Sequence, residues 1–323
     1  MSERLSAIRP YHRIYVAGHN GMVGSALTRA LRARGYANLV TRAHGELDLT
    51  DQDAVRRFFA ETAPDLVFVA AARVGGILAN AREPASFLYE NLAIELNVIH
   101  AALRAGVKRL LFLGSSCIYP RDCPQPIREE YLLSGPLELT NEPYAVAKIA
   151  GLKLCEAFNA QYGTRYVSVM PTNLYGPGDN FDLARSHVLP ALLRKAHLAA
   201  QSAARAITVW GSGEPRRELL HVDDLAEACV LLMERDVGGG VYNVGTGADV
   251  TVRELAETVL RVVGLDARLV FDASKPDGTP QKLLDASRIR ALGWRHRYGL
   301  EEGIRLTYQW CLESGVFERA EAA

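Results

Sequence analysis

Short apolar runs alternate with segments of helical periodicity along the first half of the chain. The runs lie at 13–17, 39–41, 66–70, 110–113 and 166–170, and helical segments lie between them at 52–62, 87–105 and 144–162. Continuous apolar runs separated by helices are typical of parallel strands that helices cover on both faces. The pattern therefore predicts an α/β fold built on a doubly wound parallel sheet.

A glycine-rich loop joins the first run to the first helix. Gly18, Gly21 and Gly24 follow the strand, and a helix is expected at 25–34. Glycines at such a turn let the chain reverse tightly, let the backbone approach a pyrophosphate and let the helix pack closely on the sheet. The loop predicts a Rossmann-type site for a dinucleotide, and the alternative is a plain glycine-rich turn. The residues expected to line this site are Gly18, Asn20, Gly21, Met22, Val23 and Gly24.

The residue after the second strand bears on which dinucleotide binds. A site for NAD would place an acidic residue there to hold the ribose 2′-hydroxyl. Here the strand ends in Val40, Thr41 and Arg42, and a guanidinium pairs well with a 2′-phosphate. Arg42 therefore favours NADP(H), and the alternative is an exposed surface arginine. Asp48 and Leu49 are expected where the adenine pocket closes.

The pattern divides the chain into two parts. A Rossmann-type NADP-binding domain is expected at 13–172, with a return segment at about 221–245 that includes a strand at 241–244. The segments 173–220 and 246–323 are expected to form a smaller α/β substrate-binding domain. This second domain should lie over the carboxyl ends of the strands, where doubly wound folds bind ligands.

The second half of the chain is expected to contain a turn and three helices. The turn lies at 173–178 and the helices at 187–199, 223–235 and 251–263. Val222 and Asp223 are expected to cap the second of these helices. A Thr-x-x-Glu capping box, Thr251 with Glu254, predicts the start of the third.

Tyr144 and Lys148 are the first candidates for catalysis. They lie four residues apart in a predicted helix, so their side chains share a face. A phenol has a pKa near about 10, and a neighbouring ammonium is expected to lower it toward the working range. Ser115, after the strand at 110–113, is placed to hydrogen-bond the same substrate oxygen. The three residues predict a proton-donating site for reduction of a carbonyl, although Tyr-x-x-x-Lys alone is also common on ordinary helix surfaces.

Cys117 and His187 are two further candidates for acid–base chemistry. Cys117 follows Ser115 by two residues, and a continued pleated strand would place both side chains on one face. A stabilised thiolate can act as a base, although an isolated cysteine is more often a small buried hydrophobe. His187 opens a predicted helix and could face the same cleft from the opposite side, although a lone histidine is usually a surface or core residue. Such a pair would suit proton removal and return on the carbons beside the carbonyl of a keto-sugar.

The composition excludes several classes of function. Acidic and basic residues number 37 each, which gives no indication of bulk binding to nucleic acid or membranes. The five cysteines are odd in number and scattered, as expected in a reducing cytosol. No apolar run approaches the roughly 20 residues that span a bilayer. A soluble cytoplasmic protein is expected, with no metal site.

Six longer motifs carry a family resemblance. They lie at 18–25, 74–77, 113–120, 141–151, 170–177 and 274–280. Together they resemble the GDP-L-fucose synthases, a group within the extended short-chain dehydrogenase/reductase family, and the resemblance covers nearly the whole chain. It implies an enzyme that epimerises GDP-4-keto-6-deoxy-D-mannose at C3 and C5 and then reduces the C4 ketone with NADPH to give GDP-L-fucose.

The resemblance also implies a role for each candidate. Tyr144 would donate a proton to the C4 oxygen, Lys148 would lower its pKa and bind the nicotinamide ribose, and Ser115 would orient the ketone. Cys117 would be the epimerisation base, and His187 the acid that reprotonates the opposite face. The cofactor-binding residues implied are Leu113, Gly114, Ser115, Ser116, Lys148, Pro171, Thr172, Asn173, Leu174 and His187. The substrate contacts implied are Lys195, Trp210, Arg217 and Asp277, with Lys282 as a further candidate.

One residue departs from the family pattern. The family often carries arginine where this chain has Asn20, which leaves Arg42 as the expected cation for the 2′-phosphate. A preference for NADPH is still expected, but by a smaller margin. Members of the family usually form homodimers through two helices of each subunit, which here would be 87–105 and 144–162.

Two other functions stay open on the sequence alone. Another nucleotide-sugar epimerase or dehydratase of the same scaffold would hold NAD tightly and recycle its hydride. Cys117 and His187 would have no obvious role in such an enzyme, and a 4,6-dehydratase would need a glutamate near Ser115. A non-catalytic NADP-binding regulator is the other alternative, and the intact Ser115, Tyr144 and Lys148 argue against it.

Overall fold

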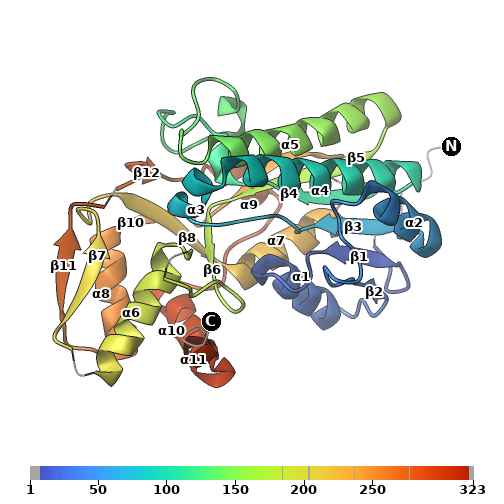
Figure 1. Ribbon diagram of the computed structural model, residues 1–323. Helices are drawn as coiled ribbons and strands as arrows, with labels where there is room; N and C mark the ends of the chain where they lie inside the picture. Colours follow the sequence, from blue (N-terminus) through green and yellow to red (C-terminus); the bar gives the residue numbers. More distant parts are fainter. Residues whose placement is uncertain (1–7, 184, 203, 236, 276, 320–323) are drawn as a thin grey trace.

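Six parallel strands form the central sheet of the protein (Figure 1). The structure, a computed structural model, describes residues 8–319 except 184, 203, 236 and 276. In spatial order the strands are β2 (Leu39–Val40), β1 (Ile14–Ala17), β3 (Leu66–Val69), β4 (Arg109–Leu113), β5 (Arg165–Pro171) and β9 (Gly240–Val244). All neighbouring strands pair in parallel, so their carboxyl ends meet at one edge. The predicted doubly wound α/β fold is confirmed.

Alternate residues of the strands contribute to two apolar layers, one on each face of the sheet. Ile14 and Val16 belong to one layer, and Tyr15 and Ala17 to the other, because successive side chains of a strand point to opposite faces. The first layer packs against α1 (Met22–Ala33) and α7 (Val222–Glu234), and the second against α2 (Gln52–Thr62), α4 (Pro84–Arg104) and α5 (Glu142–Tyr162). Both faces of β1, β3 and β4 are therefore buried, which explains why these strands are continuous apolar runs.

The elements of this sheet lie close to their predicted positions. The helix at 52–62 and the return strand, now β9 beside β5, are confirmed. Helix α1 begins at Met22 instead of residue 25, and α4 begins at Pro84 instead of residue 87. Both helices start earlier because Gly21 and Glu83 already serve as their N-caps.

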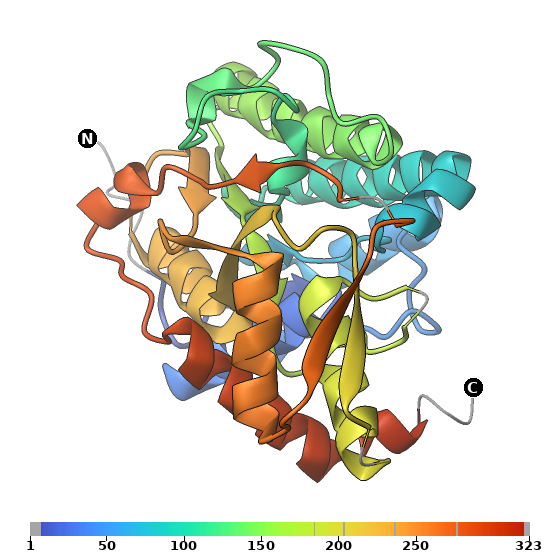
Figure 2. The ribbon, with the colours of Figure 1, turned by 90° about the vertical axis from the view of Figure 1, so that its left-hand side faces the viewer.

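A smaller mixed assembly covers the carboxyl edge of the central sheet (Figure 2). One sheet joins β6 (Asn173–Tyr175), β8 (Arg216–His221), β10 (Asp249–Thr251) and β12 (Gln281–Lys282), and a second pairs β7 (Ala206–Trp210) with β11 (Arg268–Asp272). Their helices are α6 (Val188–Gln201), α8 (Val252–Val263), α10 (Leu300–Ser314) and α11 (Val316–Arg319). These helices and strands share a third apolar cluster.

Two local predictions in this second half are wrong. The segment at 173–175 is a strand, β6, and not part of a turn, because it pairs with β8. Helix α7 is capped by His221, whose side chain accepts a hydrogen bond from the N–H of Asp223, and not by Val222 and Asp223. The capping box at Thr251 and Glu254 is confirmed, and it opens α8.

The remaining short elements connect these layers. They are α3 (Ile77–Arg82), η1 (Ser116–Ile118), η2 (Glu129–Tyr131) and α9 (Ser287–Ala291). Among the described helices, none combines the length and the apolar character needed to cross a bilayer.

Candidate active site

The glycine loop lies between β1 and the N-terminus of α1, at the carboxyl edge of the sheet. Gly18 has a φ of 81°, and a Cβ there would lie 2.7 Å from the backbone of Ala71. A Cβ on Gly24 would lie 2.6 Å from the carbonyl carbon of Gly18. The N-cap of α1 is Gly21, which has no side chain to hydrogen-bond the first N–H groups of the helix. A glycine cradle at an uncapped helix N-terminus fits the diphosphate of a dinucleotide.

The residues predicted for the adenosine end lie after β2. The Arg42 side chain is exposed, donates to the carbonyl oxygen of Thr41 at 2.8 Å and lies 5.5 Å from the centre of the Phe58 ring. Asp48 accepts hydrogen bonds from the N–H and the hydroxyl of Thr50, which lower the pKa of its carboxyl group. Leu49 accepts a hydrogen bond from Asn97 at its carbonyl oxygen. All three residues lie in the connection from β2 to α2, and because β2 pairs with β1 in parallel, this connection starts at the same sheet edge as the glycine loop.

The candidates after β4 and β5 reach the same edge. Leu113 ends β4, and the N–H of Gly114 donates to the carbonyl oxygen of Val169 at 2.9 Å, which keeps these two strand ends together. Pro171 ends β5, and Leu174 lies in β6. Side chains of Thr172 and Asn173 both donate to the carbonyl oxygen of Glu218, at 3.1 and 3.0 Å. The chain is therefore fixed where it passes from the central sheet to the smaller assembly.

Tyr144 and Lys148 share the face of α5 that the spacing predicts. The Lys148 ammonium lies 5.8 Å from the centre of the Tyr144 ring, and the Phe87 ring meets the Tyr144 ring edge to face at 6.4 Å. The predicted effect of Lys148 on the phenol is wrong for the free protein. The pKa of Tyr144 lies well above its ordinary value, because burial raises it and the negative forms of Cys117 and Glu95 raise it further. Lys148 itself is paired with Glu95, at 3.0 Å between Nζ and Oε1.

Ser115 and Cys117 are close together, but not for the predicted reason. The strand stops at Leu113, and Ser115 is the N-cap of the 3₁₀ turn η1, which contains Cys117. The pleated-strand argument is therefore wrong. The hydroxyl of Ser115 instead accepts a hydrogen bond from the N–H of Cys117 at 3.3 Å. The cap holds the buried thiol beside the serine.

Burial sets the protonation of the second acid–base pair. It raises the pKa of the Cys117 thiol, although Lys282 and Ser115 oppose the rise. Desolvation by the surrounding protein lowers the pKa of His187, although the residue keeps an exposed surface, and the charge of Lys282 lowers it further. The free protein therefore holds a thiol and a neutral imidazole at neutral pH. The same lysine acts on both groups, which places the candidates Cys117, His187 and Lys282 around one site.

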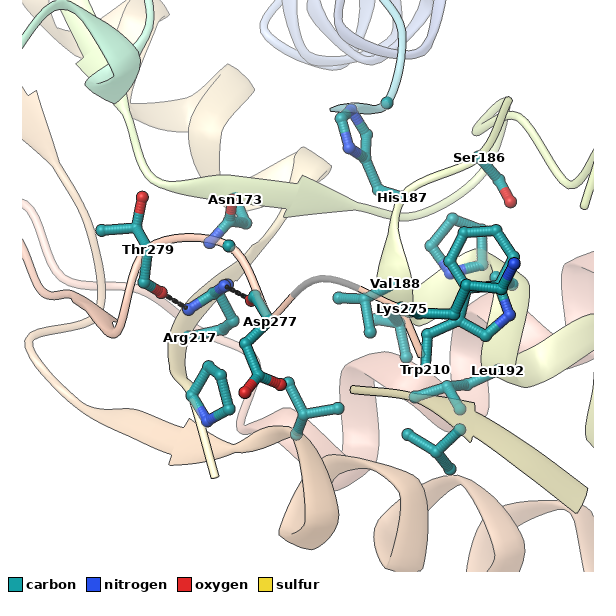
Figure 3. Close-up of a pocket in the computed structure, with 18 of the residues that line it drawn as sticks. Asn173, Ser186, His187, Val188, Leu192, Trp210, Arg217, Lys275, Asp277 and Thr279 are labelled. Atoms are coloured by element: carbon teal, nitrogen blue, oxygen red, sulfur yellow. Dashed lines mark hydrogen bonds between the residues drawn. The ribbon is translucent and has the colours of Figure 1, made fainter. Parts of the chain in front are cut away.

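A cavity of about 330 Å³ lies where α6, β8 and the loop before β12 meet. His187, Lys195, Trp210, Arg217, Asp277 and Lys282 all line it, together with Asn173 and Leu174. Figure 3 shows His187, Trp210, Arg217 and Asp277 around this space. The structure thus brings together the four predicted substrate contacts and one predicted catalytic residue.

Three of the predicted substrate contacts in this cavity, Arg217, Asp277 and Lys195, are already hydrogen-bonded. Arg217 donates to the carbonyl oxygens of Thr279 at 2.6 Å and Asp277 at 3.0 Å (Figure 3). The Asp277 carboxylate accepts from the N–H and the hydroxyl of Ser212, at 2.7 and 2.9 Å. Lys195 donates to the carbonyl oxygen of Thr208, and its ammonium lies 5.4 Å from the centre of the Trp210 ring. These bonds hold the side chains in place before a ligand enters.

Three residues of the site escaped the sequence analysis. Lys275 places a second ammonium 5.4 Å from the centre of the Trp210 ring, Ser212 orients Asp277, and Glu95 pairs with Lys148. Lys275 lies in a motif that had been recognised. Glu95 has only a weak signal: it is one of two glutamates in a largely apolar helix, and such an acid is usually solvated. Among the described residues, no group of acidic, histidine or cysteine side chains is arranged to hold a metal ion.

Comparisons with known proteins agree with this geometry. Residues 14–245 match the model of the NAD dependent epimerase/dehydratase family. The GDP-L-fucose synthase of Escherichia coli K12 is 56% identical over 313 residues, which cover 94% of this chain and 97% of that protein. GDP-L-fucose synthase 1 of Arabidopsis thaliana is 54% identical, and the match covers 94% of each chain.

Two solved structures have the same fold. A GDP-L-fucose synthetase from Naegleria fowleri bound to NADP is 29% identical, with a TM-score of 0.87 over 96% of this chain and 95% of that one. A GDP-6-OMe-4-keto-L-xylo-heptose reductase from C. jejuni is 38% identical, with a TM-score of 0.89 over 96% of this chain and 100% of that one. The chain therefore belongs to the NAD dependent epimerase/dehydratase family, whose members bind NAD(P), and within it to the GDP-L-fucose synthases.

Proposed function

We propose that this protein converts GDP-4-keto-6-deoxy-D-mannose to GDP-L-fucose, by epimerisation at C3 and C5 and then NADPH-dependent reduction of the C4 ketone. Identity of 56% over nearly the full length of a GDP-L-fucose synthase supports this activity. The observation that carries the mechanism is that Cys117 lies beside both Ser115 and Tyr144. A base for the neighbouring carbons and donors for the ketone oxygen then belong to one site.

Epimerisation needs a base and an acid on opposite faces of the sugar. The C4 ketone acidifies the protons on C3 and C5, so that Cys117 as a thiolate can remove one and His187 as an imidazolium can return one. The free protein holds a thiol and a neutral imidazole, which together carry the same number of protons. A proton shift between the two groups, with no net uptake, prepares the site. The ammonium of Lys282 favours the thiolate.

The enolate and the ketone use the same oxygen site. Ser115 and Tyr144 donate hydrogen bonds to the C4 oxygen and stabilise its developing charge. NADPH, when bound, supplies the hydride for C4. Tyr144 then gives its proton to the C4 oxygen: the phenol O–H bond breaks, the sugar O–H bond forms, and the phenolate recovers a proton from solvent. Reduction comes last because it removes the carbonyl that makes the C3 and C5 protons acidic.

The cofactor site favours NADPH over NADH. Arg42 follows the end of β2, where a 2′-phosphate would lie, and its guanidinium lies against the Phe58 ring. Asn20 in the glycine loop is uncharged, so Arg42 provides most of the discrimination. Lys148 is proposed to bind the nicotinamide ribose.

The cavity beside His187 is proposed to bind the nucleotide part of the substrate. Lys195 and Arg217 would face the diphosphate, and Trp210 would pack against an apolar or planar part of the ligand. Arg217 would exchange one of its carbonyl partners for a phosphate oxygen, a stronger charge-assisted bond. Asp277, held by Ser212, would accept hydrogen bonds from sugar hydroxyls or from the base.

We also propose a cytoplasmic homodimer that forms through α4 and α5. These helices pack along each other, and their outer surfaces expose Tyr89, Leu96, Val146 and Tyr162. Light scattering of the purified protein tests the dimer, because L96E should convert it to a monomer. A monomeric wild type would contradict the proposed interface.

The activity is tested by mixing the purified protein with NADPH and GDP-4-keto-6-deoxy-D-mannose. Loss of NADPH absorbance and an NMR spectrum of GDP-L-fucose are expected. An unepimerised 6-deoxy product would support the proposed reductase site but would contradict the epimerisation roles of Cys117 and His187. No oxidation of NADPH would contradict the proposed function.

A further inference from the structure

A buried glutamate, Glu95, forms an ion pair with Lys148, the neighbour of Tyr144 in the candidate site. Lys148 and Glu95 are 2% and 1% exposed, and Nζ lies 3.0 Å from Oε1. Glu95 belongs to α4 and Lys148 to α5, two helices that run side by side (Figure 1). Charges in an apolar interior need partners, because desolvation is costly for each ion alone. Glu95 therefore provides the counter-charge for a residue that is central to the proposed function.

Besides its pairing with Glu95 of α4, the Lys148 ammonium has two contacts with β4. It donates to the carbonyl oxygen of Leu113 at 3.0 Å, and it lies 4.9 Å from the centre of the Phe112 ring. Both residues belong to β4, the strand that leads to Ser115. An ammonium has three N–H donors, and the carbonyl oxygen of Leu113 accepts from one of them, while the Glu95 carboxylate balances the charge from 3.0 Å away. A ligand at the Tyr144 hydroxyl would also meet the ammonium, because Nζ lies 5.8 Å from the centre of the Tyr144 ring.

The carboxylate of Glu95 fits because residue 151 is glycine. A Cβ at Gly151 would lie 2.5 Å from Oε2 of Glu95 and 2.6 Å from Cζ of Phe112. Glycine in the middle of a helix is unfavourable relative to alanine. Helix α5 nevertheless has glycine at the position that faces the carboxylate, one turn after Lys148. The space for Glu95 is therefore built by both helices.

Glu95 also acts on the phenol. Its negative charge raises the pKa of Tyr144, after the larger effect of burial. Burial raises the pKa of Glu95 itself, and the ammonium of Lys148 opposes that rise. The charged or titratable groups around Tyr144 come from three directions: Glu95 on α4, Lys148 on α5 and Cys117 on η1, with Lys282 of β12 beyond the thiol. Glu95 is the carboxylate in this set, so it offsets the cation that would otherwise draw the proton from the phenol.

We propose that Glu95 is a positioning residue for the ketone reduction: it anchors the Lys148 ammonium and balances its charge, so that Tyr144 keeps its proton until the substrate oxygen accepts it. This inference rests on the proposed function. Glu95 acts through Lys148, with which it pairs in the contact between α4 and α5. Its removal should change how the reaction depends on pH, and a purely structural residue would not do this.

The test compares E95Q, which keeps the size and removes the charge, with E95D, which keeps the charge and shortens the side chain. D224N is the matched control. Asp224 is also a buried carboxylate, but it lies on the other face of the sheet and accepts hydrogen bonds from the N–H groups of Arg297 and Tyr298. For each full-length variant, kcat and kcat/KM for NADPH oxidation are measured against pH with GDP-4-keto-6-deoxy-D-mannose, together with Tm.

The charge of Glu95 predicts distinct results for the three variants. E95Q should lower kcat about tenfold, as expected for loss of a charge-assisted contact, and should move the alkaline limb of the profile to lower pH. E95D should lower kcat but keep the limb at the position of the wild type. D224N should lower Tm without moving the limb. If E95Q does not fold, the decision rests on E95D, and an unchanged kcat in that variant overturns the inference.

The experiment distinguishes failure of this inference from failure of the proposed function. An E95Q profile that superimposes on the wild type after scaling would reduce Glu95 to a structural residue. If D224N moves the alkaline limb of the pH profile as far as E95Q does, the shift reports general destabilisation, and the inference is overturned. Absence of turnover by the wild type would instead remove the proposed function, and this inference with it.

Discussion

The glycine loop offers a sharp test of the cofactor site, through the substitution Gly24→Ala. The new Cβ would lie 2.6 Å from the carbonyl carbon of Gly18 and 2.8 Å from Cα of His19. These are backbone atoms, which cannot rotate away, so the loop and the first turn of α1 must separate by roughly 1 Å to reach ordinary contact distances. Overpacking of this kind costs about 1–3 kcal/mol of folding free energy. The loss should lie near the upper end, because two backbone segments must move together.

The same displacement should weaken NADPH binding. The N–H groups at the start of α1 would move by about the same distance, and losing one or two hydrogen bonds to a charged diphosphate corresponds to roughly ten- to a hundredfold in Kd. Thermal unfolding of the free protein measures the first effect, and quenching or enhancement of NADPH fluorescence measures the second.

Gly21→Ala is the matched control in the same loop. A Cβ at Gly21 would lie 3.4 Å from the carbonyl oxygen of Gly18, an ordinary contact, and the backbone there has a φ of −76°. G21A should therefore unfold close to the wild type, and any loss of NADPH affinity in it would report the close approach of the ligand. Equal stability of G24A and G21A would refute the steric argument.

Three further predictions follow from single side chains. R42A should weaken NADPH binding at least tenfold and leave NADH almost unchanged; equal losses in kcat/KM for both cofactors would contradict the role of Arg42. C117S should slow exchange of the substrate C3 and C5 protons in D₂O about a hundredfold or more by NMR, and unchanged exchange would remove Cys117 from epimerisation. Burial raises the pKa of Asp179 from 3.8 to about 7, so the folded protein retains a proton that the unfolded chain loses, and stability falls as pH rises between these values. The Tm advantage of D179N over the wild type should therefore grow by a few degrees from about pH 5 to about pH 8, and a constant difference would argue against a buried neutral carboxyl.

Much of the central sheet could be predicted because its signals are local. The runs that became β1, β3, β4 and β5 are buried on both faces, so each appears in the sequence as a continuous apolar segment. Strand β6 lacks such a signal. Asn173 to Tyr175 pair with β8, and both the asparagine side chain and the neighbouring Thr172 bond to Glu218 in that strand. Only the tertiary fold determines that these residues are extended.

The backbone of the candidate site could likewise not be predicted from local sequence signals. Sequence motifs named the residues that gather around Cys117, Tyr144 and His187, but they did not predict the backbone that brings them together. Cys117 reaches Ser115 through a 3₁₀ turn that the serine hydroxyl caps. A strand pleat would have required the chain to remain extended, and no pattern in six residues distinguishes the two conformations.

The expected effect of Lys148 on Tyr144 failed for a physical reason that also explains the site. The spacing of four residues correctly predicts that the two side chains share a face. Burial nevertheless raises the pKa of Tyr144, and the negative forms of Cys117 and of Glu95, which comes from a different helix, raise it further. A lysine without a counter-ion would favour the phenolate, which cannot donate a proton to a ketone. In the proposed reaction, with Glu95 beside it, the ammonium would hold a ligand while the phenol stays protonated. The buried ion pair would thus reconcile two demands, a cation for binding and an acid for reduction, that the Tyr-x-x-x-Lys motif alone would set against each other.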